Sequence, residues 1–351
     1  MKDIGEGTIR RIDWTELTPV VLLLRVLNVA LGVRVLAIAL IGLWLTMTLN
    51  SFAQISFLDQ AFLDQGWTEM PRLNVPLDLF YSVWTTIQSI RQDKPMLLLW
   101  WLPCLVLIWT LCGGMTCRIV ALRLTVDESE TTKNLFLFFR KRGIGFVSSL
   151  VILTLGILCC FLPVKIAGWL MLVPGLNYVV AFLFPIPLLF AFLTVILVLG
   201  LAIGWTLLFA AVSTDGSDGF DAISRMFSYI YQRPLHYLLY WACCGILGWL
   251  GFYLVQTIAL LTAHLCWNVV LNEDNFLVSF WMALILSLPV AYVFAWFWTS
   301  SVAIYLLLRR SVDATPFNEI YRVVPPKTRM LPTIKPDERG APEIEQTNPD
   351  A

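Results

Sequence analysis

The sequence predicts an all-α integral membrane bundle of six transmembrane helices, arranged as three hairpin repeats with interfacial elbow helices. The chain of 351 residues is 58% hydrophobic and only 14% charged, with a mean hydropathy of +0.77. A soluble domain carries roughly 25% charged residues, so this apolar excess needs lipid as its solvent. Six separate apolar stretches also reach the length of about 20 residues that a spanning helix requires.

The membrane domain is expected at 34–323, and its six helices follow from the apolar stretches. We expect spans at about 34–53, 97–119, 146–170, 180–212, 236–266 and 277–308. Pro185 and Pro187 predict a kink or a short broken turn at the start of the fourth span. The glycines of "CGGMTC" (112–117) and "GWLG" (248–251) predict close packing between helices.

Segments outside the spans have their own signals. Residues 1–33 form a cytoplasmic N-terminal segment that we expect to include an interfacial helix over about 15–33. The amphipathic stretch at 76–91 predicts a second interfacial helix. Residues 324–351 are rich in proline and polar side chains, which predicts a disordered cytoplasmic tail.

The distribution of Lys and Arg predicts the orientation. Basic residues gather before the first span, in the connection 118–142 and at Arg309-Arg310. The opposite side carries only Arg72, Arg91, Lys94 and Lys165. By the positive-inside rule, both termini face the cytoplasm of a bacterial inner membrane.

Three aspartates interrupt the apolar sequence in "AAVSTDGSDGFDAISRMFSYIYQRP" (210–234). An EF-hand loop has oxygen ligands at alternate positions and a distal Glu, and this segment has neither. The apolar period after Gly219 instead predicts a short helix with Asp218 as its N-cap and Asp221 at N3. The alternative is a metal or anion site at the interface, formed by Asp218, Asp221 and Arg225.

The elbow has a second copy and a weaker third one. In "SVDATPFNEIY" after the sixth span, Thr315 is the expected cap and Pro316 the first helical residue. "TVDESETTKNLFLF" follows the second span with the weaker match. The structural elbow caps are therefore predicted at Asp215, Asp218, Asp221, Asp313 and Thr315. Together these copies predict three parallel repeats, each a membrane hairpin followed by an elbow helix.

Paired spans with a capped "F-[DN]-x-I" elbow over 95–322 resemble a loose group of uncharacterised bacterial polytopic membrane proteins. That group is similar to the membrane domain fused to some glycerophosphodiester phosphodiesterases and, more distantly, to Yip-type proteins. The resemblance implies an accessory or lipid-associated role in the membrane. It implies no phosphodiesterase activity, because the catalytic domain of those enzymes has no counterpart in this sequence.

The spans carry little chemistry of their own. Lys, Arg, Asp and Glu are missing from 35–49, 97–117, 143–164, 166–214, 235–272 and 275–308. A proton or cation path would need an acidic residue at mid-membrane. His236 and His264 are 28 residues apart in one span, about 42 Å along a helix, so they cannot bind one haem together. We therefore expect no catalytic residue, no cofactor and no metal.

The leading functional prediction is a non-enzymatic membrane scaffold or accessory subunit that organises a partner protein or lipids at the cytoplasmic face. Its expected partners are membrane lipids and a protein or a second copy of the chain, and not nucleic acid, since the net charge is zero. One alternative is a transporter or channel for a lipid or apolar solute. Another is an enzyme acting on lipid head groups through Asp215, Asp218 and Asp221 with Arg225.

Overall fold

The computed structural model describes residues 21–52, 88, 95–269, 276–322, 334–336 and 342–344. The interfacial helix expected at 76–91 lies outside these residues apart from Gln88. The chain divides into two units, Met1–Tyr321 and Arg322–Ala351. The first unit is helical and holds every expected span.

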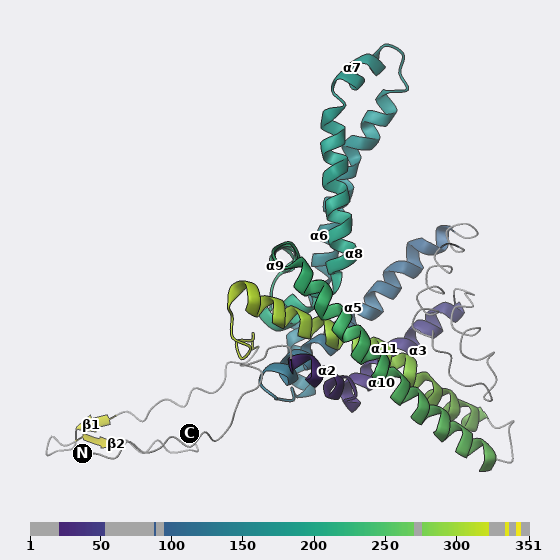
Figure 1. Ribbon diagram of the computed structural model, residues 1–351, viewed down its shortest axis with the longest axis vertical. Helices are drawn as coiled ribbons and strands as arrows, with labels where there is room; N and C mark the ends of the chain where they lie inside the picture. The colour runs from purple at the N-terminus through teal and green to yellow at the C-terminus, as the bar shows by residue number, and fades with distance from the viewer. Residues whose placement is uncertain are drawn as a thin grey trace. The chain divides into compact units, whose positions relative to one another are not determined.

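Nine helices are described in the first unit (Figure 1). They are α2 (Leu22–Ala30), α3 (Val33–Phe52), α5 (Pro95–Thr125), α6 (Thr132–Leu170), α7 (Leu176–Phe182), α8 (Pro185–Asp215), α9 (Gly219–Gln232), α10 (Pro234–Val269) and α11 (Phe276–Asp313). Six of them, α3, α5, α6, α8, α10 and α11, are long and apolar enough to cross a membrane. The predicted all-α membrane bundle with six spans is confirmed.

The helix ends differ from the predicted span ends. α6 begins at Thr132 rather than near 146, so the connection expected at 118–142 shrinks to a short turn after Thr125. The basic residues from Lys133 onward have good helix propensity and extend α6 beyond its apolar part. Consequently no separate elbow helix follows the second span in the described chain. The break predicted at Pro185 is confirmed, because α7 ends at Phe182 and α8 begins at the proline.

The elbow helix predicted after the sixth span is wrong. α11 ends at Asp313, and Ala314 has a positive φ of 54° that stops the helix. Residues 314–321, which we call the strap, continue in turn and irregular conformation, so Thr315 caps no helix. The physical reason is that Arg309 binds backbone carbonyls of Pro316 and Glu319, which folds the strap back toward α11.

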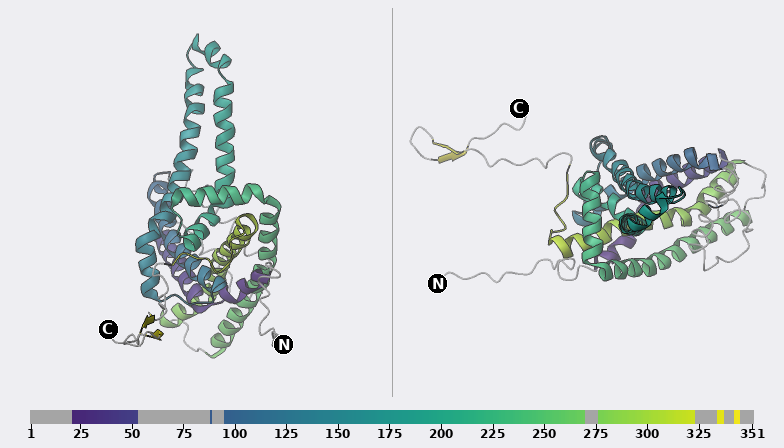
Figure 2. Two further views of the ribbon diagram at one scale, coloured as in Figure 1. Left: turned by 90° about the vertical axis from the view of Figure 1, so that its left-hand side faces the viewer. Right: turned by 90° about the horizontal axis from the view of Figure 1, so that it is seen from above.

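Consecutive spans pack as three hairpins, α3 with α5, α6 with α8, and α10 with α11. α11 is the central helix, since it also contacts α2, α3, α5 and α8. The α6–α8 hairpin projects away from the other spans (Figures 1 and 2), whereas α3 stays beside α11 as far as Trp44, whose Nε1 donates to Ser287 Oγ at 3.3 Å. The α6–α8 hairpin is therefore joined to the other spans at one end, where α8 contacts α5, α9 and α11.

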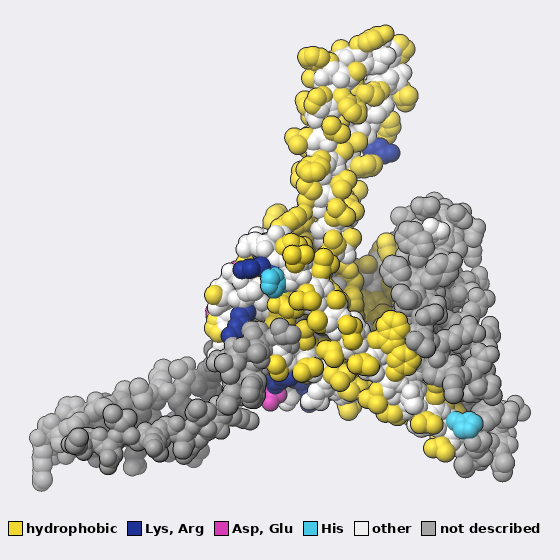
Figure 3. Space-filling view, viewed as in Figure 1, with side chains coloured by type: hydrophobic (Ala, Val, Ile, Leu, Met, Phe, Trp, Pro, Cys, Tyr) yellow, Lys and Arg dark blue, Asp and Glu magenta, His cyan; other side chains and the backbone are white. Residues whose placement is uncertain are grey.

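Burial follows the same arrangement. α8 is exposed through Ile186, Leu189 and Phe192 but buried from Thr206 to Thr214. α11 is buried almost continuously from Ala295 to Arg309. Apolar side chains cover the outer parts of α6 and α8 (Figure 3), as expected of helices that face lipid. The packed core therefore lies where the six spans converge.

Glycines allow the closest helix contacts, as the sequence predicts. A Cβ on Gly113 of α5 would stand 2.4 Å from the Trp298 ring of α11. One on Gly248 of α10 would stand 2.2 Å from Trp296 Nε1. Contacts this short leave no room for a side chain, so these glycines set the spacing of α11 from α5 and α10.

The structure describes parts of both terminal segments. The described part of the N-terminal helix, α2, buries Leu22, Leu23 and Val26 and packs against α11, α10 and α5. One face of α2 is therefore packed against the spans, and its expected place at the membrane interface stays a prediction. In the second unit, β1 (Ile334–Pro336) pairs antiparallel with β2 (Pro342–Ile344), within the tail that the sequence predicts to be disordered. Strands of three residues are marginally stable alone, and disorder of the tail stays a prediction.

Candidate functional site

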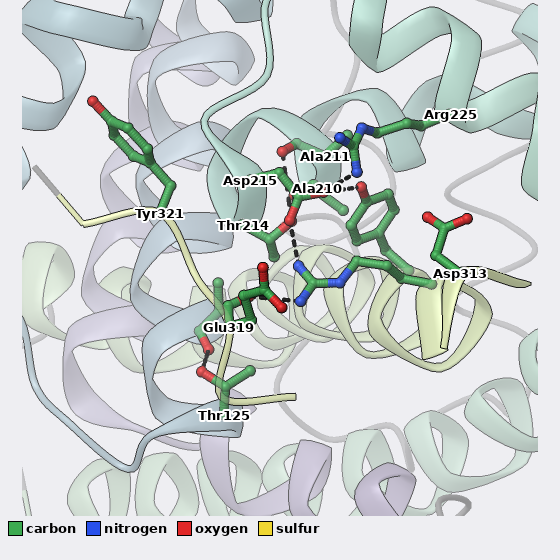
Figure 4. Close-up of polar contacts among 12 residues, drawn as sticks. Thr125, Ala210, Ala211, Thr214, Asp215, Arg225, Asp313, Glu319 and Tyr321 are labelled. Atoms are coloured by element: carbon green, nitrogen blue, oxygen red, sulfur yellow. Dashed lines mark hydrogen bonds and ion pairs between the residues drawn. The ribbon is translucent and has the colours of Figure 1, made fainter. Parts of the chain in front are cut away.

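Asp215, the last residue of α8, accepts hydrogen bonds from three side chains (Figure 4). Arg309 Nη1 donates to its Oδ1, Arg225 Nη1 donates to Oδ2 at 3.0 Å, and the Tyr305 hydroxyl donates to Oδ2 at 2.5 Å. The Asp215 side chain is 12% exposed. Asp215, Arg225, Tyr305 and Arg309 form what we call the Asp215 cluster, and it joins α8 to α9 and α11.

Arg309 uses both ends of its guanidinium fork. While Nη1 binds Asp215, Nη2 donates to the carbonyls of Pro316 at 3.1 Å and Glu319 at 2.6 Å. The side chain is only 3% exposed. A buried charge is tolerated when it is paired and its remaining donors are satisfied, and a planar guanidinium suits several acceptors at once. Arg309 thus holds the strap against the end of α8.

The aspartates of the elbow have separate structural roles. Asp218 is the N-cap of α9, and its Oδ1 accepts from the Asp221 backbone N–H at 2.9 Å. Asp221 lies in the first turn and pairs with Arg225 Nε at 3.0 Å. These positions are as the sequence predicts. Asp215 is different, because it serves as the acceptor of the Asp215 cluster and caps no helix.

Asp313 also differs from its predicted role as a cap. It accepts a hydrogen bond from the Tyr229 hydroxyl of α9, so it ties the end of α11 to the elbow helix. The Tyr229 ring lies 5.5 Å from that of Tyr305. Burial and the hydrogen bond to Asp313 raise the pKa of the Tyr229 hydroxyl, which therefore keeps its proton well above neutral pH.

Arg118 of α5 was not predicted as a site residue, although its side chain is only 1% exposed. Its Nε donates to Glu130 Oε2 at 3.1 Å, and its Nη1 donates to the carbonyls of Ser213 at 3.0 Å and Tyr321 at 2.9 Å. Phe138 lies under the guanidinium at 4.4 Å. In the sequence, Arg118 directly follows a charge-free run and precedes the apolar residues 119–122, which places it near a span end but does not show that its side chain is buried.

Tyr321 ends the strap as a half-buried residue packed beside Phe138 and the end of α8. Its backbone N–H donates to the Thr214 carbonyl at 2.9 Å, and Arg142 lies over its ring at 5.0 Å. Gly216, which ends α8 with a φ of 64°, leaves room for the ring, because a Cβ there would be 2.6 Å from Tyr321 Cγ. The strap is thus fixed at Arg309 and again at Arg118.

The predicted interface site of Asp218, Asp221 and Arg225 is brought together by the fold. Each of its groups already has a partner within the chain. Asp218 caps α9, and Arg225 forms ion pairs with both Asp215 and Asp221. Among the residues that the structure describes, no three metal-ligating side chains form a group that could hold an ion. His236 and His264 lie toward opposite ends of α10, and both are exposed. The arrangement can fix helix ends and offers no free carboxylate pair for acid–base chemistry.

The elbow and the Asp215 cluster therefore form a connector between helices. No protein-family model, curated protein or solved structure matches this chain.

Proposed function

We propose that this protein is a non-enzymatic scaffold or accessory subunit of the bacterial inner membrane that organises a partner protein or lipids at the cytoplasmic face. The observation that carries the proposal is that the Asp215 carboxylate is fully used in hydrogen bonds within the chain. Its two oxygens accept from Arg309, Arg225 and Tyr305, all of the same chain. The charged residues of the elbow thus connect helix ends and make one end of the bundle rigid.

The outer parts of the α6–α8 hairpin present an apolar surface. Beyond their buried ends, side chains such as Leu158, Leu162 and Leu188 are exposed. A Cβ on Gly156 or Gly168 would meet no atom of the described residues within 4 Å. A rigid base that presents a lipid-exposed hairpin suits the binding of another membrane helix, which packs best where small residues allow close approach.

Orientation and repeats are part of the same proposal. Arg118, Arg142 and Arg309 all lie at the end where the hairpins converge. By the positive-inside rule, this supports placing that end and both termini on the cytoplasmic side. The pairing of consecutive spans supports three hairpin repeats, of which only the second is followed by a separate capped helix, α9, within the described residues. The likeness to the phosphodiesterase membrane domains stays a prediction.

The test is purification of the full chain from native membranes in lipid nanodiscs, followed by mass spectrometry of everything retained. A scaffold is expected to retain one protein in fixed stoichiometry. Gly156→Leu should release that protein, because the added side chain disturbs no described contact within the chain but blocks close approach to α6. Gly245→Leu on α10 is the matched control, since its Cβ is equally free of described neighbours.

Two results would contradict the proposal. Retention of a single lipid class without any protein would favour the transporter for lipid or apolar solutes. Turnover of a lipid head group that disappears in Asp221→Ala while the fold survives would favour the enzyme.

A further inference from the structure

A polar pocket of about 300 Å³ lies between α2, the end of α5 and the turn that leads to α6. Its lining is Arg25, Asn28, Val29, Arg123, Asp127, Glu128 and Ser129. None of these residues belongs to the Asp215 cluster. The pocket holds two guanidinium groups and two carboxylates, so its formal charge is balanced.

The two arginines are available to a ligand in different ways. Arg25 pairs with Asp127 at 3.5 Å, but the two side chains are 40% and 85% exposed. An exposed pair of this kind adds little stability and is readily exchanged for another partner. Arg123 makes no hydrogen bond or ion pair with any residue that the structure describes. Gly32 leaves space for its guanidinium, since a Cβ there would be 2.7 Å from Arg123 Nη1.

The pocket lies at the depth where spans end. Arg123 is two residues before the end of α5, and α3 begins at Val33, directly after Gly32. Leu24, next to Arg25 in the sequence, and Val33, next to Gly32, are exposed apolar side chains. A polar cavity bordered by exposed apolar side chains at a helix end suits an amphiphile whose head group enters the cavity while its chains stay in lipid.

We propose that this pocket binds the phosphoethanolamine head group of a phospholipid. The phosphate takes the place of Asp127 beside Arg25 and also meets Arg123, since guanidinium groups bind phosphate through two parallel hydrogen bonds. The primary ammonium donates to Asp127 and Glu128. The balanced charges distinguish this ligand from phosphatidylglycerol, which has no cation for the carboxylates. They also distinguish it from phosphatidylcholine, whose quaternary nitrogen has no N–H to donate.

The experiment titrates the purified, delipidated full chain with phosphatidylethanolamine, phosphatidylglycerol or phosphatidylcholine, and counts bound lipid by native mass spectrometry. Phosphatidylethanolamine is expected to bind once per chain, about tenfold more tightly than the other two lipids. Arg123→Gln and Asp127→Asn should each weaken its binding about tenfold. Arg140→Gln, an exposed arginine on α6 outside the pocket, should leave the affinity unchanged.

Thermal unfolding checks that each variant is folded, and Arg25→Gln replaces Arg123→Gln if the latter is not. Equal binding of phosphatidylglycerol, or full affinity in Arg123→Gln and Asp127→Asn, overturns the proposal. Soluble phosphoethanolamine is the second arm of the test. If it displaces the lipid with the same sensitivity to Asp127→Asn, the ligand is a soluble phosphate ester of the same chemistry; if only the lipid binds, its source is the membrane.

The inference stands apart from the scaffold proposal, because it depends on a different part of the chain. Loss of a protein partner in Gly156→Leu and loss of lipid in Arg123→Gln are measured separately. Either proposal can therefore fail alone.

Discussion

Arg309 on α11 donates a hydrogen bond to Asp215 at the end of α8, across 94 positions in the sequence. Both side chains are almost fully shielded from solvent. This pair joins the last turns of two spanning helices. Because Arg309 also binds two backbone carbonyls of the strap, we expect the stability of this end of the bundle to depend on the pair.

Asp215→Asn should therefore be the most damaging single change in the elbow. It leaves the buried Arg309 charge without its counter-ion, which costs about 3–5 kcal/mol when a buried pair is broken from one side. The measurement is the free energy of unfolding in detergent or nanodiscs. Asp221→Asn is the control, because its carboxylate is 46% exposed and its pair with Arg225 is worth at most about 1 kcal/mol. Equal losses in the two variants would show that burial of the Asp215 cluster does not matter.

Arg118 and Glu130 should behave as a coupled pair. Arg118→Met alone leaves Glu130, which is 8% exposed, without its partner, and Glu130→Gln alone leaves the Arg118 charge uncompensated. The double variant removes both charges and should lose less stability than the sum of the two single changes, by about 0.5–3 kcal/mol. A double-mutant cycle of unfolding free energies measures the coupling. Additive effects would mean that the two groups act independently.

Asp218→Ala should cost about 1 kcal/mol of stability through loss of the N-cap of α9. Asp218→Ser retains an acceptor oxygen for the Asp221 N–H and should recover most of that loss. Urea or thermal unfolding of the two variants provides the comparison. If serine is no better than alanine, the charge of Asp218 and not its capping bond is what matters.

Gly248→Ala tests the close approach of α10 and α11. The added methyl group would collide with Trp296 Nε1 and disturb its hydrogen bond to the Cys244 carbonyl, which measures 3.0 Å. Overpacking of this kind costs about 1–3 kcal/mol. Gly245→Ala, three residues earlier on the same helix, adds a methyl group with no described neighbour and should be neutral or slightly stabilising. The melting temperatures of the two variants should therefore move in opposite directions or differ clearly.

Alkaline pH should weaken the link between α9 and α11. The folded state raises the pKa of Tyr229, so the folded state holds the proton more tightly than the unfolded chain does. Its contribution to stability is complete below the ordinary tyrosine pKa of about 10 and is lost as the pH rises above that value. Tyr229→Phe should be less stable than the wild type at pH 7, and the difference should shrink at higher pH. A constant difference would mean that ionisation of Tyr229 is not involved.

The sequence predicted the parts of this fold that depend on local chemistry. Apolar length alone located the six spans, and the pattern around Asp218 located α9 and its cap, because capping is decided by residues three apart. The strap could not be predicted in this way. Thr315 and Pro316 form a good helix start, but Arg309 and Arg118 bind carbonyls of the same segment from other helices and determine its path.

The burial of Arg118 could not be predicted from the sequence either. A single-sequence argument assigns an arginine at the end of an apolar run to solvent, because burial of a charge is costly. Its compensation comes from Glu130 across a turn and from backbone carbonyls at 213 and 321, which are distant in sequence. The polar pocket at Arg25 and Arg123 is equally a product of tertiary structure.

The contacts that fix the strap have a consequence for how this protein can change over time. Arg309 and Arg118 hold it by the main-chain oxygens of Pro316, Glu319 and Tyr321, and those oxygens are present whatever side chain is attached. Substitutions at 316 or 319 that keep the backbone path should therefore preserve the attachment. A search for related chains should therefore look for two buried arginines at the ends of the second and sixth spans. The amino-acid sequence of the strap is a weaker criterion.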